Sequence, residues 1–176
     1  ASLNLLRFLG DDDSFDVEGF KHAVRILFTA QDILVGNADY PTESIAQTSK
    51  DYRQLGLGYT NLGALLMALG LAYNSEAGRA WAGAITALMT GEAYATSAVL
   101  ASKLEPFAGY ATNQEAMQDV LRRHRSGLEH VGGEAPAEIL EAAHNSWNAA
   151  LSGCEATGVR NSQATVIAPT GTISFM

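Results

Sequence analysis

Apolar side chains recur every three or four positions over most of the chain, and this spacing predicts helices. The clearest case begins at an acidic cap, Asp16. The apolar face of that helix comprises Val17, Phe20, Val24, Leu27 and Leu34. The longest helix is expected over residues 76–104, capped by Ser75. Its many Ala and Gly residues leave little side-chain bulk, so we expect it to approach its neighbours closely and to be buried on more than one side.

Four further helices are expected from their start and stop signals, which makes six in all. Their ranges are about 41–49, 61–69, 113–131 and 136–152. Pro41 marks the start of the first of these helices, and Pro136 lies in the first turn of the last. Thr60 and Asn113 are the expected N-caps of the second and the third. The glycines at positions 132 and 133 end the third of these helices.

Short apolar stretches without helical spacing predict three strands, over residues 1–6, 54–59 and 162–168. Pro169 ends the third strand, because proline has no backbone N–H for a sheet ladder. Helices fill the gaps between the strands, as they do where crossovers join parallel strands. The sequence therefore predicts an α/β architecture that is mostly helical by content, with residues 1–176 forming a single segment.

The composition, 47% hydrophobic and 17% charged, is that of a globular protein. A net charge of −8 disfavours nucleic acid as a partner. The longest apolar stretch, residues 64–73, is too short to span a membrane, and no signal-peptide pattern opens the chain. Cys154 is the only cysteine, which excludes a disulfide framework and favours a reducing compartment, by default the cytoplasm.

Two patterns resemble known sites but depart from them. The acidic run near the N-terminus has Asp16 where a calcium loop needs glycine. The glycines at 56, 58 and 63 do not fit the dinucleotide-binding fingerprint, which requires glycine where the chain has Asn61. Close packing of a strand on a helix explains these glycines better.

The remaining candidates for chemistry favour structural roles. The four histidines, at positions 22, 124, 130 and 144, include no pair one helical turn apart, so no metal site is expected. The basic run Arg122–Arg125 favours a solvated or salt-bridged surface, with phosphate binding as the alternative. Cys154 has no basic neighbour in sequence and is expected to be an inert thiol.

The third strand runs into a loop whose residues suit an anion. Pro169 stops the ladder, and Gly171 lets the backbone approach a ligand closely. Thr170, Thr172 and Ser174 add hydroxyl donors beside consecutive backbone N–H groups. Thr and Ser also cap helices in many proteins, so the loop alone leaves phosphate binding and a simple helix start both open.

Residues 160–176 (Arg-Asn-Ser-Gln-Ala-Thr-Val-Ile-Ala-Pro-Thr-Gly-Thr-Ile-Ser-Phe-Met) resemble a signature of the large catalytic chain of ribonucleotide reductases. The form Pro-Thr-Gly-Thr-Ile is similar to the adenosylcobalamin-dependent, class II branch. Further matches follow in the same order at Ala1–Leu5, Asp39–Pro41, Arg53–Gly58 and Gly78–Gly91. The resemblance covers essentially the whole chain. Because the chain opens without an initiator Met and stops within a loop, we expect an internal segment of a longer protein.

The resemblance implies a fold and an activity. The family fold is a ten-stranded α/β barrel of two half-barrels, and this chain would be a segment of the second half. The parent would be a ribonucleoside-diphosphate reductase that reduces ribonucleotides to 2′-deoxyribonucleotides, using adenosylcobalamin and a thiol reductant such as thioredoxin. Whether the substrate is a di- or triphosphate stays open. The residues expected to bind the substrate phosphates are Pro169, Thr170, Gly171, Thr172, Ile173 and Ser174.

The sequence also departs from the family pattern. The Asn-x-Cys-x-Glu motif of the radical-bearing loop is absent, and Cys154 matches none of the reactive cysteines. No catalytic residue is therefore expected in this segment, whose partners would be the rest of the reductase chain and the ribonucleotide. Two alternatives remain, a segment of a class I large subunit and a non-catalytic helical interaction module. Whether the parent is a monomer or a homodimer stays open.

Overall fold

A computed structural model describes residues 1–169 of the chain. Six α-helices, two short 3₁₀ helices and two paired strands make up the regular structure of this part. In chain order they are β1 (Ser2–Asn4), η1 (Leu5–Phe8), α1 (Val17–Asn37), α2 (Glu43–Tyr52), β2 (Gly58–Thr60), α3 (Leu62–Ala68), α4 (Glu76–Leu104), α5 (Tyr110–Gly127), η2 (Leu128–His130) and α6 (Ala137–Thr157). The prediction of six helices is confirmed.

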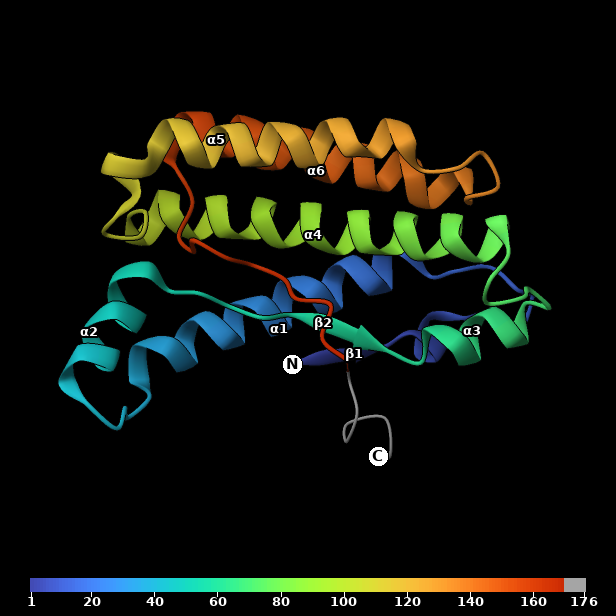
Figure 1. Cartoon of the computed structure of the whole chain (residues 1–176), viewed down its shortest axis with the longest axis horizontal. Helices are drawn as coiled ribbons and strands as arrows, with labels where there is room; N and C mark the ends of the chain where they lie inside the picture. Colours follow the sequence, from blue (N-terminus) through green and yellow to red (C-terminus); the bar gives the residue numbers. More distant parts are fainter. Residues whose placement is uncertain (170–176) are drawn as a thin grey trace.

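Helix α4 lies in the middle of the molecule (Figure 1). One layer, formed by α5 and α6, covers it on one side, and α1, α3 and the two strands lie on the other. Two neighbouring turns of α4 each contain a pair of completely buried residues, which are Ala84, Ile85, Leu88 and Met89. The prediction that this helix is buried on more than one side is therefore confirmed. None of the helices within residues 1–169 is long and apolar enough to cross a membrane.

Two helix starts follow the predicted capping chemistry. The Asp16 carboxylate accepts a hydrogen bond from the Gly19 backbone N–H at 2.8 Å, and the Ser75 hydroxyl oxygen accepts one from Gly78 at 3.0 Å. These bonds satisfy N–H groups that have no partner inside the first turn of a helix. The predicted starts of α1 and α4 are confirmed.

Two other predicted caps are wrong. Thr60 ends β2, and Asn61, in the left-handed conformation at φ 64°, takes the N-cap position of α3. Asn113 lies inside α5, which begins at Tyr110, and its side-chain amide donates to the carbonyl oxygen of Gly109 at 2.8 Å. An Asn side chain can hydrogen-bond to the backbone both at an N-cap and inside a helix, so the residue type alone does not locate the N-cap.

The strands are parallel, as an α/β architecture requires. β1 pairs with β2 in the register Ser2 to Gly58, and an isolated parallel bridge joins Leu57 to Thr165. The Leu57 N–H donates to the Ala164 carbonyl oxygen at 3.1 Å. The backbone around residue 57 therefore lies between β1 on one side and residues 163–166 on the other.

The third predicted strand, residues 162–168, is only partly realised. The stretch makes three backbone hydrogen bonds to residues 55–57, and the ladder stops after Val166. The Val166 carbonyl oxygen lies against Gly58, where a Cβ atom would approach it to 2.6 Å. Gly58, and Gly56 beside it, thus admit this neighbouring extended segment, which corrects the expectation that these glycines admit a helix.

A buried polar network joins α1 to the residues after α2. The Arg53 guanidinium donates to the Asp32 carboxylate at 2.8 Å and to the Asp32 carbonyl oxygen at 2.6 Å. Arg53 is itself in the left-handed conformation, with φ 48°. The Asn161 side-chain amide donates to the same carboxylate at 2.8 Å. All three residues are buried, so the charges of the pair are compensated by each other rather than by solvent.

The close approach of α4 and α6 depends on Gly153, and we expect Gly153→Ala to lower stability. A Cβ atom there would lie 2.7 Å from the Ala98 Cβ, which cannot rotate away. The overpacking should outweigh the helix propensity of alanine and leave a net loss of about 1 kcal/mol in urea unfolding. Gly127→Ala, at an exposed helical position with nothing near its Cβ, should instead raise stability by about 0.5 kcal/mol. Equal effects of both variants would contradict this account of the packing.

Removing the Arg53 guanidinium should be far more costly than removing an exposed one. Arg53→Met leaves the buried Asp32 carboxylate with Arg160, at 3.8 Å, as its only nearby cation among the described residues, and we expect a loss of about 3 kcal/mol. Arg122→Met breaks an ion pair with Asp119 whose side chains are both about half exposed, and should cost less than about 1 kcal/mol. The free energies of unfolding of the two variants test the difference. A loss below 1 kcal/mol for Arg53→Met would show that the buried pair contributes little.

Candidate functional site

The predicted phosphate loop lies at the limit of the described structure. Pro169 is described and exposed to solvent. The other residues of the prediction, Thr170, Gly171, Thr172, Ile173 and Ser174, lie outside the described residues. The structure therefore describes the approach to the loop, residues 158–169, which crosses from the end of α6 past α4 to the strands (Figure 1).

The approach runs parallel to both strands, toward the edge of the sheet at which β1 and β2 end. At that edge the Asn61 side-chain amide donates to the Asn4 side-chain oxygen at 2.9 Å. The same Asn4 oxygen accepts from the Leu6 backbone N–H at 3.2 Å. Ligands of α/β folds bind outside the carboxyl ends of parallel strands, so this edge is where a substrate loop is expected.

A cavity of about 820 Å³ borders the approach on its helical side. Four hydroxyl groups in its lining are paired with one another across elements. The hydroxyls of Tyr59 and Thr86 lie 2.9 Å apart, and those of Thr90 and Thr165 lie 3.1 Å apart. Burial raises the pKa of the Tyr59 phenol, which keeps it neutral and able to donate. These pairs join the strands to α4.

The basic helix α5 contributes to the rim of this cavity. Arg123 and His124 line it, and the His124 ring stacks on the buried Trp147 ring with centroids 5.7 Å apart. Arg122 pairs with Asp119 at 2.9 Å, and Arg125 donates to Glu129 at 3.1 Å. This arrangement supports the interpretation of the basic run as a salt-bridged surface.

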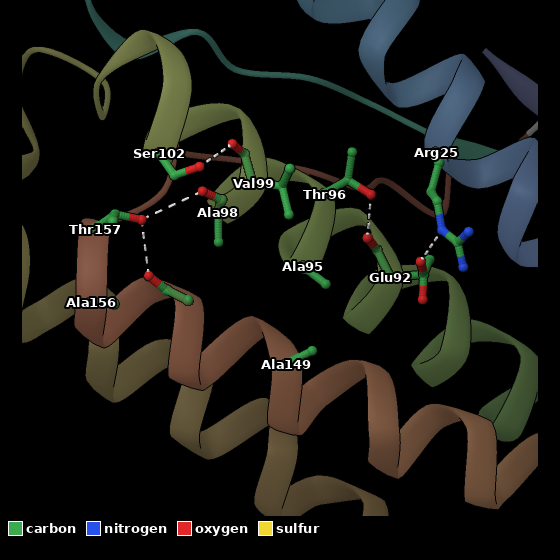
Figure 2. A pocket seen from close by; sticks show the side chains of 11 residues that line it. Arg25, Glu92, Ala95, Thr96, Ala98, Val99, Ser102, Ala149, Ala156 and Thr157 are labelled. Atoms are coloured by element: carbon green, nitrogen blue, oxygen red, sulfur yellow. Dashed lines mark hydrogen bonds and ion pairs between the residues drawn. The ribbon is translucent and has the colours of Figure 1, made fainter.

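A second cavity, of about 430 Å³, lies between α4 and α6 and is lined mainly by small side chains (Figure 2). Arg25 and Glu92 lie at one end of it, with a hydrogen bond of 2.5 Å between the Arg25 Nε and a Glu92 carboxylate oxygen. That hydrogen bond raises the pKa of Arg25. The other Glu92 oxygen accepts from the Ser146 hydroxyl at 2.6 Å. Because both oxygens are bonded, Glu92 serves as a structural anion rather than as a free acid or base.

Cys154 is buried, and burial raises the pKa of its thiol. The Tyr110 hydroxyl lies 3.4 Å from the sulfur. A neutral, enclosed thiol is a poor nucleophile, which supports the prediction of an inert cysteine. Within residues 1–169, His, Cys, Asp and Glu side chains form no group of three or more that could hold a metal ion.

The residues that carry the buried polar contacts were not predicted from the sequence. Asp32 lies one turn beyond Phe28 on the apolar face of α1, so a charge on a buried face was the available signal. Glu92 stands among small and apolar residues of α4 in the same way. Neither signal identifies the partner, because Arg53 and Arg25 lie on other elements.

Comparison with known proteins adds the family. The model of the family described as "Ribonucleotide reductase, barrel domain" matches residues 1–176. Proteins named vitamin B12-dependent ribonucleotide reductase are 51% identical in Rhodopirellula baltica and 49% identical in Streptomyces avermitilis, over 100% and 99% of this chain. A ribonucleoside-diphosphate reductase subunit alpha of Chlamydia pneumoniae is 25% identical over 99% of the chain.

The chain spans only part of these relatives, 17% of the Rhodopirellula baltica protein and 19% of that of Streptomyces avermitilis. The family model nevertheless covers every residue, including the parallel strands and the approach to the predicted loop. The similarity is thus continuous along the chain and does not depend on one motif. On this evidence the chain belongs to the ribonucleotide reductase barrel-domain family.

Proposed function

We propose that this chain is a segment of an adenosylcobalamin-dependent ribonucleotide reductase whose complete form reduces ribonucleotides to 2′-deoxyribonucleotides. The observation that carries the proposal is the identity of 51% over the whole segment with a relative named vitamin B12-dependent. Identity falls to 25% with the subunit alpha of Chlamydia pneumoniae, which disfavours the class I alternative. A non-catalytic helical module is disfavoured because the family model matches all 176 residues.

Within the parent, the segment would supply part of the barrel scaffold and the substrate-phosphate loop at residues 169–174. The parallel pairing of β1, β2 and residues 163–166 is compatible with part of a ten-stranded barrel, and we assign the segment to its second half from the resemblance of its motifs to the family. A loop that follows such a strand offers consecutive N–H groups to an anion. The phosphates of the ribonucleotide are the anion that we assign to it.

Adenosylcobalamin would supply the radical chemistry of the parent. Most of the hydroxyl and charged side chains that line the two cavities are already bonded within the protein, as in the Tyr59–Thr86 and Arg25–Glu92 pairs, which leaves few groups there for a cofactor. We therefore assign the cofactor to the remainder of the reductase chain. A thiol reductant such as thioredoxin would restore the parent after each turnover, and the cytoplasm is the compartment that suits this chemistry.

The loop assignment predicts a loss of substrate affinity in two variants of the complete enzyme. Thr172→Ala removes a hydroxyl donor, and a hydrogen bond to a charged group is worth roughly 1.5 to 3 kcal/mol, so nucleotide binding should weaken about ten- to a hundredfold. Gly171→Val places a branched side chain where the phosphate should lie. Equilibrium binding of the nucleotide measures both effects.

Thr112→Ala, which removes an exposed hydroxyl from α5, is the matched control and should leave nucleotide affinity unchanged. Cobalamin affinity should stay nearly constant in all three variants. If the two loop variants fold and bind nucleotide as tightly as the unaltered enzyme does, the loop is only the end of a strand.

The 176-residue chain by itself should form no deoxynucleotide from a ribonucleotide, adenosylcobalamin and a dithiol. Its single cysteine is buried in α6 and lies outside the Asn-x-Cys-x-Glu pattern, so no thiol is available for hydrogen abstraction. Chromatographic detection of deoxynucleotide provides the measurement, with the complete enzyme as the positive control. Turnover by the isolated chain would contradict the assignment of the radical chemistry to the rest of the protein.

A further inference from the structure

We propose that Asn161, together with Ser97, is a positioning residue for substrate binding: it anchors the start of the approach to the phosphate loop in the buried Asp32–Arg53 network. The inference rests on the proposed function of residues 169–174. It adds that the affinity of the loop depends on a contact made eight positions earlier in the sequence, inside the protein core.

Asn161 is completely buried and uses its side chain in three directions. Its amide nitrogen donates to the Asp32 carboxylate at 2.8 Å and to the Arg53 carbonyl oxygen at 3.0 Å. Its amide oxygen accepts from the Ser97 hydroxyl at 2.8 Å. The Asp32 carboxylate and the Arg53 carbonyl oxygen can only accept hydrogen bonds, so the amide nitrogen of Asn161, and not its oxygen, must face them.

Ser97, also completely buried, bonds the same stretch of backbone twice more. Its hydroxyl oxygen accepts from the Asn161 N–H at 3.0 Å, and its carbonyl oxygen accepts from the Arg160 N–H at 3.1 Å. The approach is thereby attached to α4 at the point where it leaves the helical layer. Through Asp32 it is attached to α1 as well, so two helices determine where it starts.

The anchor also aligns the approach with its neighbour in the sheet. Arg53 precedes residues 55–57, and Asn161 precedes residues 163–166, so the contact between Asn161 and the Arg53 carbonyl joins the two pairing stretches at their beginnings. At and just beyond the end of the pairing, Val166 and Ile167 are 41% and 57% exposed and are therefore weakly packed. The buried anchor thus fixes the start of the approach by side-chain hydrogen bonds, and we infer that a shift there is transmitted to the loop.

Two serine variants of the complete enzyme separate this role from general stability. Ser97→Ala removes the hydroxyl that contacts Asn161. Ser146→Ala is the matched control, because Ser146 is a buried serine whose hydroxyl donates to Glu92 at 2.6 Å, away from the approach. Both variants lose one buried hydroxyl bonded in the helical layers, so similar decreases in melting temperature are expected.

The readout is the affinity for a nucleotide substrate and for the corresponding nucleoside, which lacks phosphate, along with KM and kcat. We expect Ser97→Ala to raise the Kd and KM for the nucleotide about three- to tenfold with kcat within twofold, because a remote phosphate contact contributes equally to the ground and transition states. Nucleoside affinity should stay constant. Ser146→Ala should change none of these values.

Asn161→Ala removes all three side-chain hydrogen bonds of Asn161 and should weaken nucleotide binding more than Ser97→Ala does; if it does not fold, Ser97→Ala decides. The inference is overturned if Ser97→Ala leaves the nucleotide Kd within twofold, or if Ser146→Ala raises it as much. The Gly171→Val variant separates the two proposals. Weakened binding there with unchanged binding in Ser97→Ala rejects the anchor alone, whereas unchanged binding in Gly171→Val rejects the loop and the anchor together.

Discussion

The close packing of α4 against its neighbours is the constraint on which the rest of the structure depends. Because α4 is buried on both sides, its residues must be small where α6 approaches, as at Gly153 against Ala98. Its buried polar residues must find partners within the protein. Ser97 contacts the approach to the loop, and Glu92 contacts Arg25 and Ser146. Through the contacts of these buried residues, α4 connects the α5–α6 layer to the strands.

The polar contacts differ from the apolar ones in what they specify. Apolar side chains in a core tolerate exchange when volume is conserved, whereas a buried amide or carboxylate requires a partner at a defined place. The Asp32–Arg53 pair and Asn161 lie where α1, α4 and the sheet meet. We interpret this network as the feature that fixes how α1, α4 and the sheet lie relative to one another. Its cost is the desolvation of two charges.

Local physics explains what could be predicted from the sequence. The caps at Asp16 and Ser75 and the ends of α4 depend on neighbouring residues, and all were predicted correctly. The cap of α3 was wrong because Asn61 adopts a left-handed backbone that the neighbouring sequence does not reveal. The third strand was only partly right, since pairing depends on residues 55–57, which are distant in sequence. The Asp32 network could not be predicted, because its four members, Asp32, Arg53, Ser97 and Asn161, come from separate parts of the chain.

The placement of residues 55–57 between β1 and residues 163–166 has a consequence for folding kinetics. Ala1 bonds to Gly56, 55 residues away, and Asn161 bonds to Arg53 and Asp32 across 108 and 129 residues. Contacts that close such long loops form slowly, whereas helices such as α4 and α6 form from local interactions. The helical layers should therefore collapse first, and the parallel pairing together with the approach to the loop should be completed last. Until then the strand edges are open to pairing with other chains, so aggregation during refolding would be the characteristic failure of this segment.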